Sequence, residues 1–281
     1  MKRLDWEQWI TTGAWRHTDG AALPVAPGVL GEALQIAGED DPDARRLTAL
    51  VRRDQVLTAR VLRLANSAAA GAAREITRVD EAVVRLGTTS VRRLVLSLCL
   101  ASWTTPEDEQ ALPGVDVMRH AIGAGCMARF AAPLVDADPE ECFVGGLLHD
   151  LGKLALVRLR ALFVRRGGIG PSRADFADSL AAHHADAGAL LLQLWGVPER
   201  LRAGVRWHHV PADAADPHLA SIIWLANRLC HRYGLGCAAS PDDDLLEDPL
   251  ALTVGVTPAW LVTIDARVAS VMEDALAHVA A

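Results

Sequence analysis

Apolar positions recur at the spacing of amphipathic helices along almost the whole chain, and several of these runs begin with helix-capping residues. The motif DPEE at 138–141 predicts a helix that starts with a capped proline and continues over about 139–149. Asp-Pro at 216–217 and Thr-Pro at 257–258 repeat this device. Further helices are predicted near residues 4–12, 28–37, 43–53, 55–66, 78–86, 89–103, 114–131, 151–165, 183–195, 198–209, 217–233 and 258–279, with another that begins after Ser172.

Alternation of polar and apolar residues, the mark of a half-buried strand, is nearly absent. The run SVRRLVLSLCLASW at 90–103 is apolar enough for a buried strand, but its length and the threonines before it favour a buried helix. Breaks at 104–114, 165–172 and 235–249 are predicted as surface loops. We therefore expect an all-α protein with two lobes joined by the first break, followed by a C-terminal helix.

The composition narrows the classes of protein and partner. Hydrophobic residues make up 51% of the 281 residues and aromatic residues only 5%, so the core must be mostly Leu, Val and Ala, which favours helices. The net charge of −7 removes any general attraction to nucleic acids or anionic membranes. Arginines at 45–46 and 52–53, with the run VRRLVLSL, are a weaker candidate for a nucleic-acid face, because nearby acidic residues favour an ordinary solvated surface.

The expected compartment follows from the cysteines and the apolar runs. The five cysteines form no CxxC pair, which is typical of a reducing compartment. The N-terminus mixes acids with tryptophans, unlike a signal peptide, and no stretch of about 18 apolar residues is free of charge. We expect a cytoplasmic protein without a membrane span.

The strongest chemical signal is the stretch GGLLHDLGKLAL at 145–156, which places His149 and Asp150 side by side in an apolar run. Burying either group costs several kcal/mol unless it is paired, hydrogen-bonded or bound to a metal. The sequence must therefore supply partners from elsewhere. Lys153 lies one helical turn from His149 and could pair with Asp150 or neutralise a phosphate.

Candidate partners lie on several predicted helices. Asp116 and His120 are four residues apart, so on one helix both side chains leave the same face and could reach a common ion. In the helix after Pro198, both His208 and His209 fall on the apolar stripe, which turns them toward the core. All three histidines are therefore candidate ligands.

A second pair of adjacent histidines cannot both be central, because neighbouring helical positions differ by about 100°. His184 shares its face with Gly188, which allows another helix to approach, so it is a better candidate than His183. Asn227 lies on the apolar side of its helix and offers a neutral oxygen. A set rich in imidazole, without thiolate, suits Fe, Mn, Ni or Zn; histidines satisfied separately in the core are the alternative.

These residues carry a family likeness. His149-Asp150, with His120 before it and His184, His208 and His209 after it, resembles the HD superfamily of metal-dependent phosphohydrolases and, within it, the HDOD domain of bacterial signalling proteins. The stretches DQVLTARVLRLANSAAAG at 54–71 and EITRVDEAVVRLGTTSVRRLVLSL at 75–98 look like the helices that precede the HD core. The resemblance implies an N-terminal helical lobe over 1–110, an HD-like core over 111–235 and a C-terminal extension with one long helix over 236–281.

Two departures bear on activity. The late aspartate ligand of HD hydrolases is matched here by Asn227, a weaker ligand, and no GYP signature of the cyclic-di-GMP phosphodiesterases follows the two late histidines. The first hypothesis is a regulatory module, non-catalytic or weakly catalytic, that contacts a protein partner and either binds a metal or nucleotide in the cleft or keeps only the residues of such a site. The second is a metal-dependent phosphohydrolase acting on a nucleotide or cyclic dinucleotide. In both, the metal ligands are His120, His149, Asp150, His184, His208 and His209, with Asp116 and Asn227 as additional candidates; Asp150 and Lys153 are catalytic only in the second.

Overall fold

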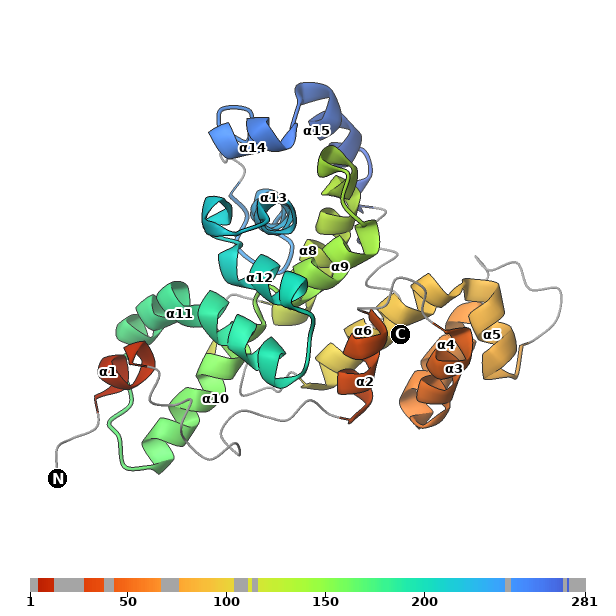
Figure 1. Ribbon diagram of the computed structural model, residues 1–281, viewed down its shortest axis with the longest axis horizontal. Coiled ribbons are helices and arrows are strands. Elements are labelled where there is room, and N and C mark those ends of the chain that lie inside the picture. Colours follow the sequence, from red (N-terminus) through yellow and green to blue (C-terminus); the bar gives the residue numbers. More distant parts are fainter. Residues whose placement is uncertain are drawn as a thin grey trace.

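The computed structural model describes residues 5–12, 28–37, 43–66, 76–103, 111–112, 116–240, 244–269 and 272 (Figure 1). Every regular element within these ranges is a helix, which confirms the all-α prediction. None of these helices is both long and apolar enough to cross a lipid bilayer. In chain order the elements are α1 (Trp6–Thr11), α2 (Gly28–Ala37), α3 (Ala44–Arg52), α4 (Gln55–Ala65), α5 (Val79–Leu86), α6 (Thr88–Trp103), α8 (Val117–Ala131), η3 (Ala132–Val135), α9 (Pro139–Leu148), α10 (Leu151–Arg165), α11 (Arg173–Leu194), α12 (Glu199–Trp207), η4 (Pro211–Asp213), α13 (Pro217–Tyr233), α14 (Pro249–Val254) and α15 (Pro258–Asp265).

Helices α2 to α6 pack on one another as an N-terminal group, at the lower right of Figure 1. The apolar run that also resembled a strand forms α6, as predicted, and Val91, Val95 and Leu96 are at most 1% exposed. A helix that is apolar on most sides needs neighbours on most sides. Helix α6 contacts α2 to α5 on one side and α8 and α9 on the other, so it joins the N-terminal group to the rest of the molecule.

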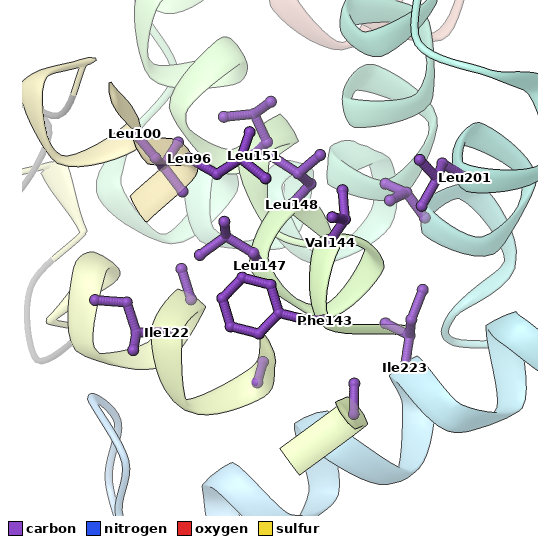
Figure 2. Packing of buried hydrophobic residues seen from close by; sticks show 14 of the residues in the cluster. Leu96, Leu100, Ile122, Phe143, Val144, Leu147, Leu148, Leu151, Leu201 and Ile223 are labelled. Carbon is purple, nitrogen blue, oxygen red and sulfur yellow. The ribbon is translucent and has the colours of Figure 1, made fainter. Parts of the chain in front are cut away.

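Helix α9 is the most deeply buried element of the second group, which comprises α8 to α13. Every residue from Cys142 to Asp150 is buried, and α8, α12 and α13 all contact α9. Figure 2 shows the side chains of Phe143, Val144 and Leu147 spread among these neighbours. Each buried apolar side chain of this size contributes about 1.5–3 kcal/mol. The packing therefore holds the C-terminal end of α9, where the His-Asp pair follows, in the interior.

Helices α10 and α11 cross at a point where only a glycine fits. A Cβ atom added to Gly152 would lie 1.8 Å from the carbonyl oxygen of His184 and 2.6 Å from the amide nitrogen of Gly188. The missing side chain lets the two backbones touch. This contact brings the start of α10 next to the part of α11 that carries His184.

Helix α1 packs on the second group, although it precedes the N-terminal group in the chain (Figure 1). The rings of Trp6 and Trp9 lie 5.5 and 5.2 Å from that of Phe163 on α10, and Trp6 Nε1 donates a hydrogen bond of 2.9 Å to Ser179 Oγ on α11. Both tryptophans are at most 6% exposed. Both are therefore packing anchors of the fold.

Two boundaries of the core helices differ from the predicted ones. The helix predicted over 183–195 is the second half of α11, which continues without a break from its cap at Ser172. The helix predicted over 198–209 ends earlier, at Trp207, because the amide of Val210 donates to the Trp207 carbonyl in a tighter turn. The other predicted core helices begin and end within a few residues of the observed ones.

The C-terminal extension also differs from the prediction. The long helix expected over 258–279 ends at Asp265, where the amide of Arg267 donates to the carbonyl of Ile264 three residues earlier. The short helix α14 was not predicted, although its Asp-Pro start at 248–249 repeats the device seen elsewhere. Six residues of helix give too short an apolar pattern to stand out.

The crossing of α10 and α11 can be tested with Gly152→Ala. A methyl group that meets two backbones cannot be accommodated by rotating a side chain, so we expect a loss of at least about 3 kcal/mol in the free energy of unfolding, measured by urea denaturation. Gly28→Ala is the control, because a Cβ there meets nothing within 4 Å. A similar small effect of both substitutions would show that α10 and α11 do not approach as described.

Candidate metal centre

The His-Asp pair forms the turn between α9 and α10. His149 is the C-cap residue of α9 and is 0% exposed, and Asp150 is the N-cap residue of α10 and is 7% exposed. The carboxylate of Asp150 does not cap its own helix, unlike the other aspartate caps in the core. It is turned instead toward side chains from other helices.

Three imidazoles surround that carboxylate at equal distance. The Nε2 atoms of His120, on α8, and of His149 each lie 3.4 Å from Asp150 Oδ2. The Nε2 atom of His184, on α11, lies 3.4 Å from the other oxygen, Oδ1. Helices distant in sequence therefore direct the same ring nitrogen at one buried acid, as expected for three of the predicted ligands.

A second group of imidazoles adjoins the first and shares His184 with it. His184 Nε2 lies 3.4 Å from Nε2 of His208, the C-cap residue of α12, and 2.9 Å from Nε2 of His209. The ligand atoms of His184, His208 and His209 all lie within 4.8 Å of one another, as do those of His120, His149 and Asp150. Each trio is compact enough to hold one metal ion. Asp150 belongs to the first trio, and its Oδ1 faces His184 of the second.

Backbone carbonyls orient four of these rings through their other nitrogen. An Nδ1–H group that donates to a carbonyl leaves a lone pair on Nε2, the form that binds a metal. The Nδ1–oxygen pairs are His120 with Leu235 at 3.1 Å, His149 with Gly146 at 2.7 Å, His184 with Leu180 at 2.6 Å and His208 with Val205 at 2.6 Å. The carbonyls of Gly146, Leu180 and Val205 lie three or four residues before the histidine that each binds. The preceding helical turn therefore sets the orientation of these three rings.

The resulting arrangement places lone pairs against one another. His184 and His208 both donate from Nδ1, so their Nε2 atoms face each other across 3.4 Å without a proton between them. In addition, His149 Nε2 and Asp150 Oδ1 are buried and have no hydrogen-bond partner. Buried acceptors without a donor are costly. One or two cations would satisfy all of these atoms, so the residues present fit a metal centre.

The electrostatics of the cluster favour the neutral, ligating form of most of its histidines. Burial lowers the pKa of His149 to about 3 and also lowers the pKa values of His184 and His208. Burial would also lower the pKa of His120, but hydrogen bonds with Asp150 and Cys237 outweigh it and raise the value to about 9. Without a metal, a proton on His120 partly compensates the acid.

Burial would raise the pKa of Asp150, but the charges of neighbouring groups hold it well below the usual value. The closest of these groups is Lys153, whose Nζ lies 2.6 Å from Asp150 Oδ2. Its side chain is 28% exposed, so the ammonium group stands between the buried acid and solvent. Lys153 thus pairs with Asp150, one of the two roles expected from the sequence.

Two of the predicted ligands lie differently from the prediction. Asp116 is exposed and caps α8, where its Oδ1 accepts from the amide of Arg119; it does not share a face with His120, because an N-cap residue has extended rather than helical backbone. His209 lies beyond the end of α12 and is exposed, although its Nε2 reaches His184. The prediction that the apolar stripe buries His209 was therefore wrong.

The remaining candidates lie where the helical faces placed them. His184 is 3% exposed in the cluster, whereas His183 lies on the outer side of α11, 3.5 Å from Glu7. Asn227 is half-buried, and its Oδ1 has no hydrogen-bond partner. One turn further along α13, the ring of His231 lies 5.8 Å from that of His120, so this face of α13 is turned toward the centre.

A loop that carries no predicted site residue completes the support of His120. Leu235 accepts from its ring, and the carbonyl of Gly236 accepts from the amide of Asp116 at 2.8 Å. Gly236 has φ of +72°, and a Cβ there would lie 2.3 Å from the amide nitrogen of His120. Only glycine fits this position. The glycine in LGCAAS was the one available signal in the sequence.

A narrow recess adjoins the first trio at the junction of the two helix groups. Its polar lining consists of His120, Asp150 and Lys153, of which His120 and Lys153 both contact Asp150. The rest of the wall is aliphatic. It is formed by Leu112, which lies between α6 and α8, and by side chains of four helices: Leu100 of α6, Val117 and Ala121 of α8, Leu147 of α9, and Leu151 and Leu154 of α10.

Comparison with known proteins identifies the family. The sequence profile of the HDOD domain matches residues 23–211. The chain belongs to the HDOD family. A relative from Treponema pallidum, described only as an uncharacterized protein, is 27% identical over 220 residues, which cover 73% of this chain and 41% of that protein.

Solved structures agree with this HDOD fold. An HDOD domain protein with unknown function from Geobacter sulfurreducens has a TM-score of 0.67 at 21% identity, covering 96% of this chain and 98% of its own. A protein from Marinobacter aquaeolei, described provisionally as a signal transduction protein, has a TM-score of 0.71 at 22% identity over 92% of this chain and 60% of its own. One from Shewanella amazonensis, described provisionally as a phosphohydrolase, has a TM-score of 0.64 at 23% identity over 92% and 96%.

The metal centre can be tested with two aspartate variants. Asp150→Asn removes the charge that both trios face, so we expect the affinity for Mn²⁺ or Zn²⁺ to fall by more than about 100-fold in calorimetric titrations. Asp116→Asn should change it by less than about twofold, since asparagine caps a helix as well as aspartate does. Equal losses in both variants would return Asp116 to the ligand set.

Removal of metal should leave a protein with a characteristic pH profile. Between pH 3 and 6.5 His149 is protonated in the unfolded chain but not in the folded one. The free energy of unfolding should therefore decrease as the pH falls through this range, by up to about 1.4 kcal/mol per pH unit for each such histidine. The contribution of His120 has the opposite sign: it is present below pH 6.5 and lost as pH rises through about 9. Urea midpoints of the chelator-treated protein measure both limbs, and His149→Gln should flatten only the acid limb.

Proposed function

We propose that this chain is a regulatory HDOD module whose cleft binds divalent transition metal, and that it acts by binding a ligand or a protein partner rather than by turnover. The observation that carries the proposal is the position of Asp150. One buried carboxylate has an imidazole 3.4 Å from each of its oxygens. A metal centre needs this arrangement of donor atoms, whereas a core packed for stability alone does not need a buried charge.

Each trio supplies the donors for one ion. His120, His149 and Asp150 would hold one, and His184, His208 and His209 the other, with Fe, Mn, Ni or Zn as suitable metals. A bound ion supplies a Lewis acid that attracts anionic oxygens. The chain's own contribution at the accessible edge is Lys153, which could bind the same anion once a metal takes over its place at Asp150.

Binding without turnover is supported by Asn227. By resemblance, Asn227 matches the late carboxylate ligand of the HD hydrolases, so an ion held with His120, His149 and Asp150 would have one negative charge fewer around it. Such a centre would hold that ion more weakly, and hydrolysis would suffer because water is activated only while the ion is bound. The name of the Marinobacter structure, a signal transduction protein, fits a regulatory role. A protein partner and a nucleotide or other phosphate ligand are both consistent with it.

The alternative function is a metal-dependent phosphohydrolase acting on a nucleotide or cyclic dinucleotide. It is favoured by the two adjacent trios, since paired ions are a common arrangement for phosphate hydrolysis. In that case Asp150 would position the ions and Lys153 would stabilise the phosphate oxygens. The name of the Shewanella structure, a phosphohydrolase, is consistent with this reading.

The two functions are separated by metal analysis combined with an activity assay. We expect protein purified without added metal to contain stoichiometric Fe, Mn, Ni or Zn, and to show no chelator-sensitive hydrolysis of bis-p-nitrophenyl phosphate or cyclic di-GMP. Asn227→Asp should then produce measurable hydrolysis, and Asn227→Ala should not. Wild-type turnover that disappears in Asp150→Asn would establish the hydrolase instead, and protein without metal would end both proposals.

A further inference from the structure

The N-terminal helix α1 depends on the rest of the molecule for its helical state. A helix of six residues is not stable in isolation, because nucleation costs more than so few hydrogen bonds return. Residues 13–27 separate α1 from α2, and a connection of that length can span about 50 Å, so it does not dictate where α1 lies. The docked position of α1 therefore depends on its side-chain contacts with α10 and α11.

The polar contacts of α1 lie on the part of α11 that carries a candidate metal ligand. Ser179 Oγ accepts a hydrogen bond of 2.9 Å from Trp6 Nε1 and donates one of 3.2 Å to Glu7 Oε2. The other carboxylate oxygen of Glu7 lies 3.5 Å from Nε2 of His183. His184 follows directly, and the carbonyl that orients its ring belongs to the residue after Ser179. Both points at which α1 holds α11 are therefore adjacent in sequence to the groups that fix this ligand.

We propose that α1 is a latch on the metal centre, so that docking of α1 and occupation of the second trio favour each other; this inference rests on the proposed metal-binding function. Without metal, the Nε2 atoms of His184 and His208 face each other at 3.4 Å with no proton between them, which favours displacement of the His184 ring. A bound metal would hold this ring in place and strengthen its bond to the Leu180 carbonyl, because the ligated ring is a more polarised donor. The part of α11 on which α1 docks would then be fixed from both sides.

The coupling runs in both directions, because a coupling free energy between two sites is reciprocal. Whatever draws α1 away from α10 and α11 would weaken metal binding at His184, and a bound metal would retain α1. The rings of Phe163 and Phe176, which α1 covers, lie 5.5 and 5.9 Å from the ring of Trp6. Release of α1 would uncover part of both rings. The outer surface of the module would therefore change together with the state of its metal centre.

Amide hydrogen exchange of the full-length chain tests the coupling without any substitution. We expect exchange in residues 6–11 to be at least about fivefold slower in protein loaded with Zn²⁺ than in the same protein after chelation. Helix α15 is the internal control, because it is also short and is held on α8 and α13, where Trp260 packs on Phe130 and Asp265 accepts from Tyr233. Equal protection of both helices would reflect a general stabilisation by metal and would overturn the latch.

The reciprocal test is Trp6→Ala, which removes the hydrogen bond to Ser179 and the ring that packs on Phe163 and Phe176. Truncation of a buried tryptophan is among the most destabilising substitutions, so it should release a helix of six residues. We expect the affinity for Zn²⁺ to fall by at least about fivefold in calorimetric titrations. Trp260→Ala on α15 is the matched control and should change the affinity by less than about twofold.

The outcomes separate this inference from the proposed function. An affinity for Zn²⁺ that is unchanged in folded Trp6→Ala, or that falls equally in Trp260→Ala, would overturn the latch while metal binding stands. If Trp6→Ala does not fold, Trp6→Phe takes its place, because it keeps a ring and removes only the donor to Ser179. Elemental analysis that finds no metal in the loaded wild-type protein would instead overturn the proposed function.

Discussion

The constraint on which the centre depends is the cost of burying the Asp150 carboxylate. The position of this acid is fixed by α9, which is buried from Cys142 to its C-terminal end, so the carboxylate lies in the interior. Imidazoles from other helices supply its polar neighbours. Each of them faces the acid through Nε2, because its Nδ1 is bonded to a backbone carbonyl. The backbone carbonyls that bind Nδ1 and the glycine contact between α10 and α11 both hold this arrangement in place.

The two sides of the centre have different character. Exposed His209 lies at the edge of one trio, whereas the aliphatic recess and Lys153 adjoin the other. Solvent therefore reaches the centre at His209, whereas aliphatic side chains border it on the side of Lys153. The two trios therefore differ in their access to solvent and in the side chains that border them.

Much of this arrangement was predictable from the sequence because it follows from local rules. Capping residues located the helices, the face shared with Gly188 distinguished His184 from His183, and the buried His-Asp pair demanded partners. The errors arose where a helix begins or ends: Asp116 caps its helix, and His209 lies beyond the end of another. The helical rule for neighbouring side chains does not apply at those positions.

Other features could not have been predicted, since they join residues far apart in the chain. The carbonyl of Leu235 that orients His120 comes from a loop more than a hundred residues later. Gly236 lies in the same loop, and its backbone packs against the amide of His120. A change in the path of this loop would therefore move the backbone of His120 and the carbonyl that orients its ring at the same time, which couples the loop to one of the candidate ligands.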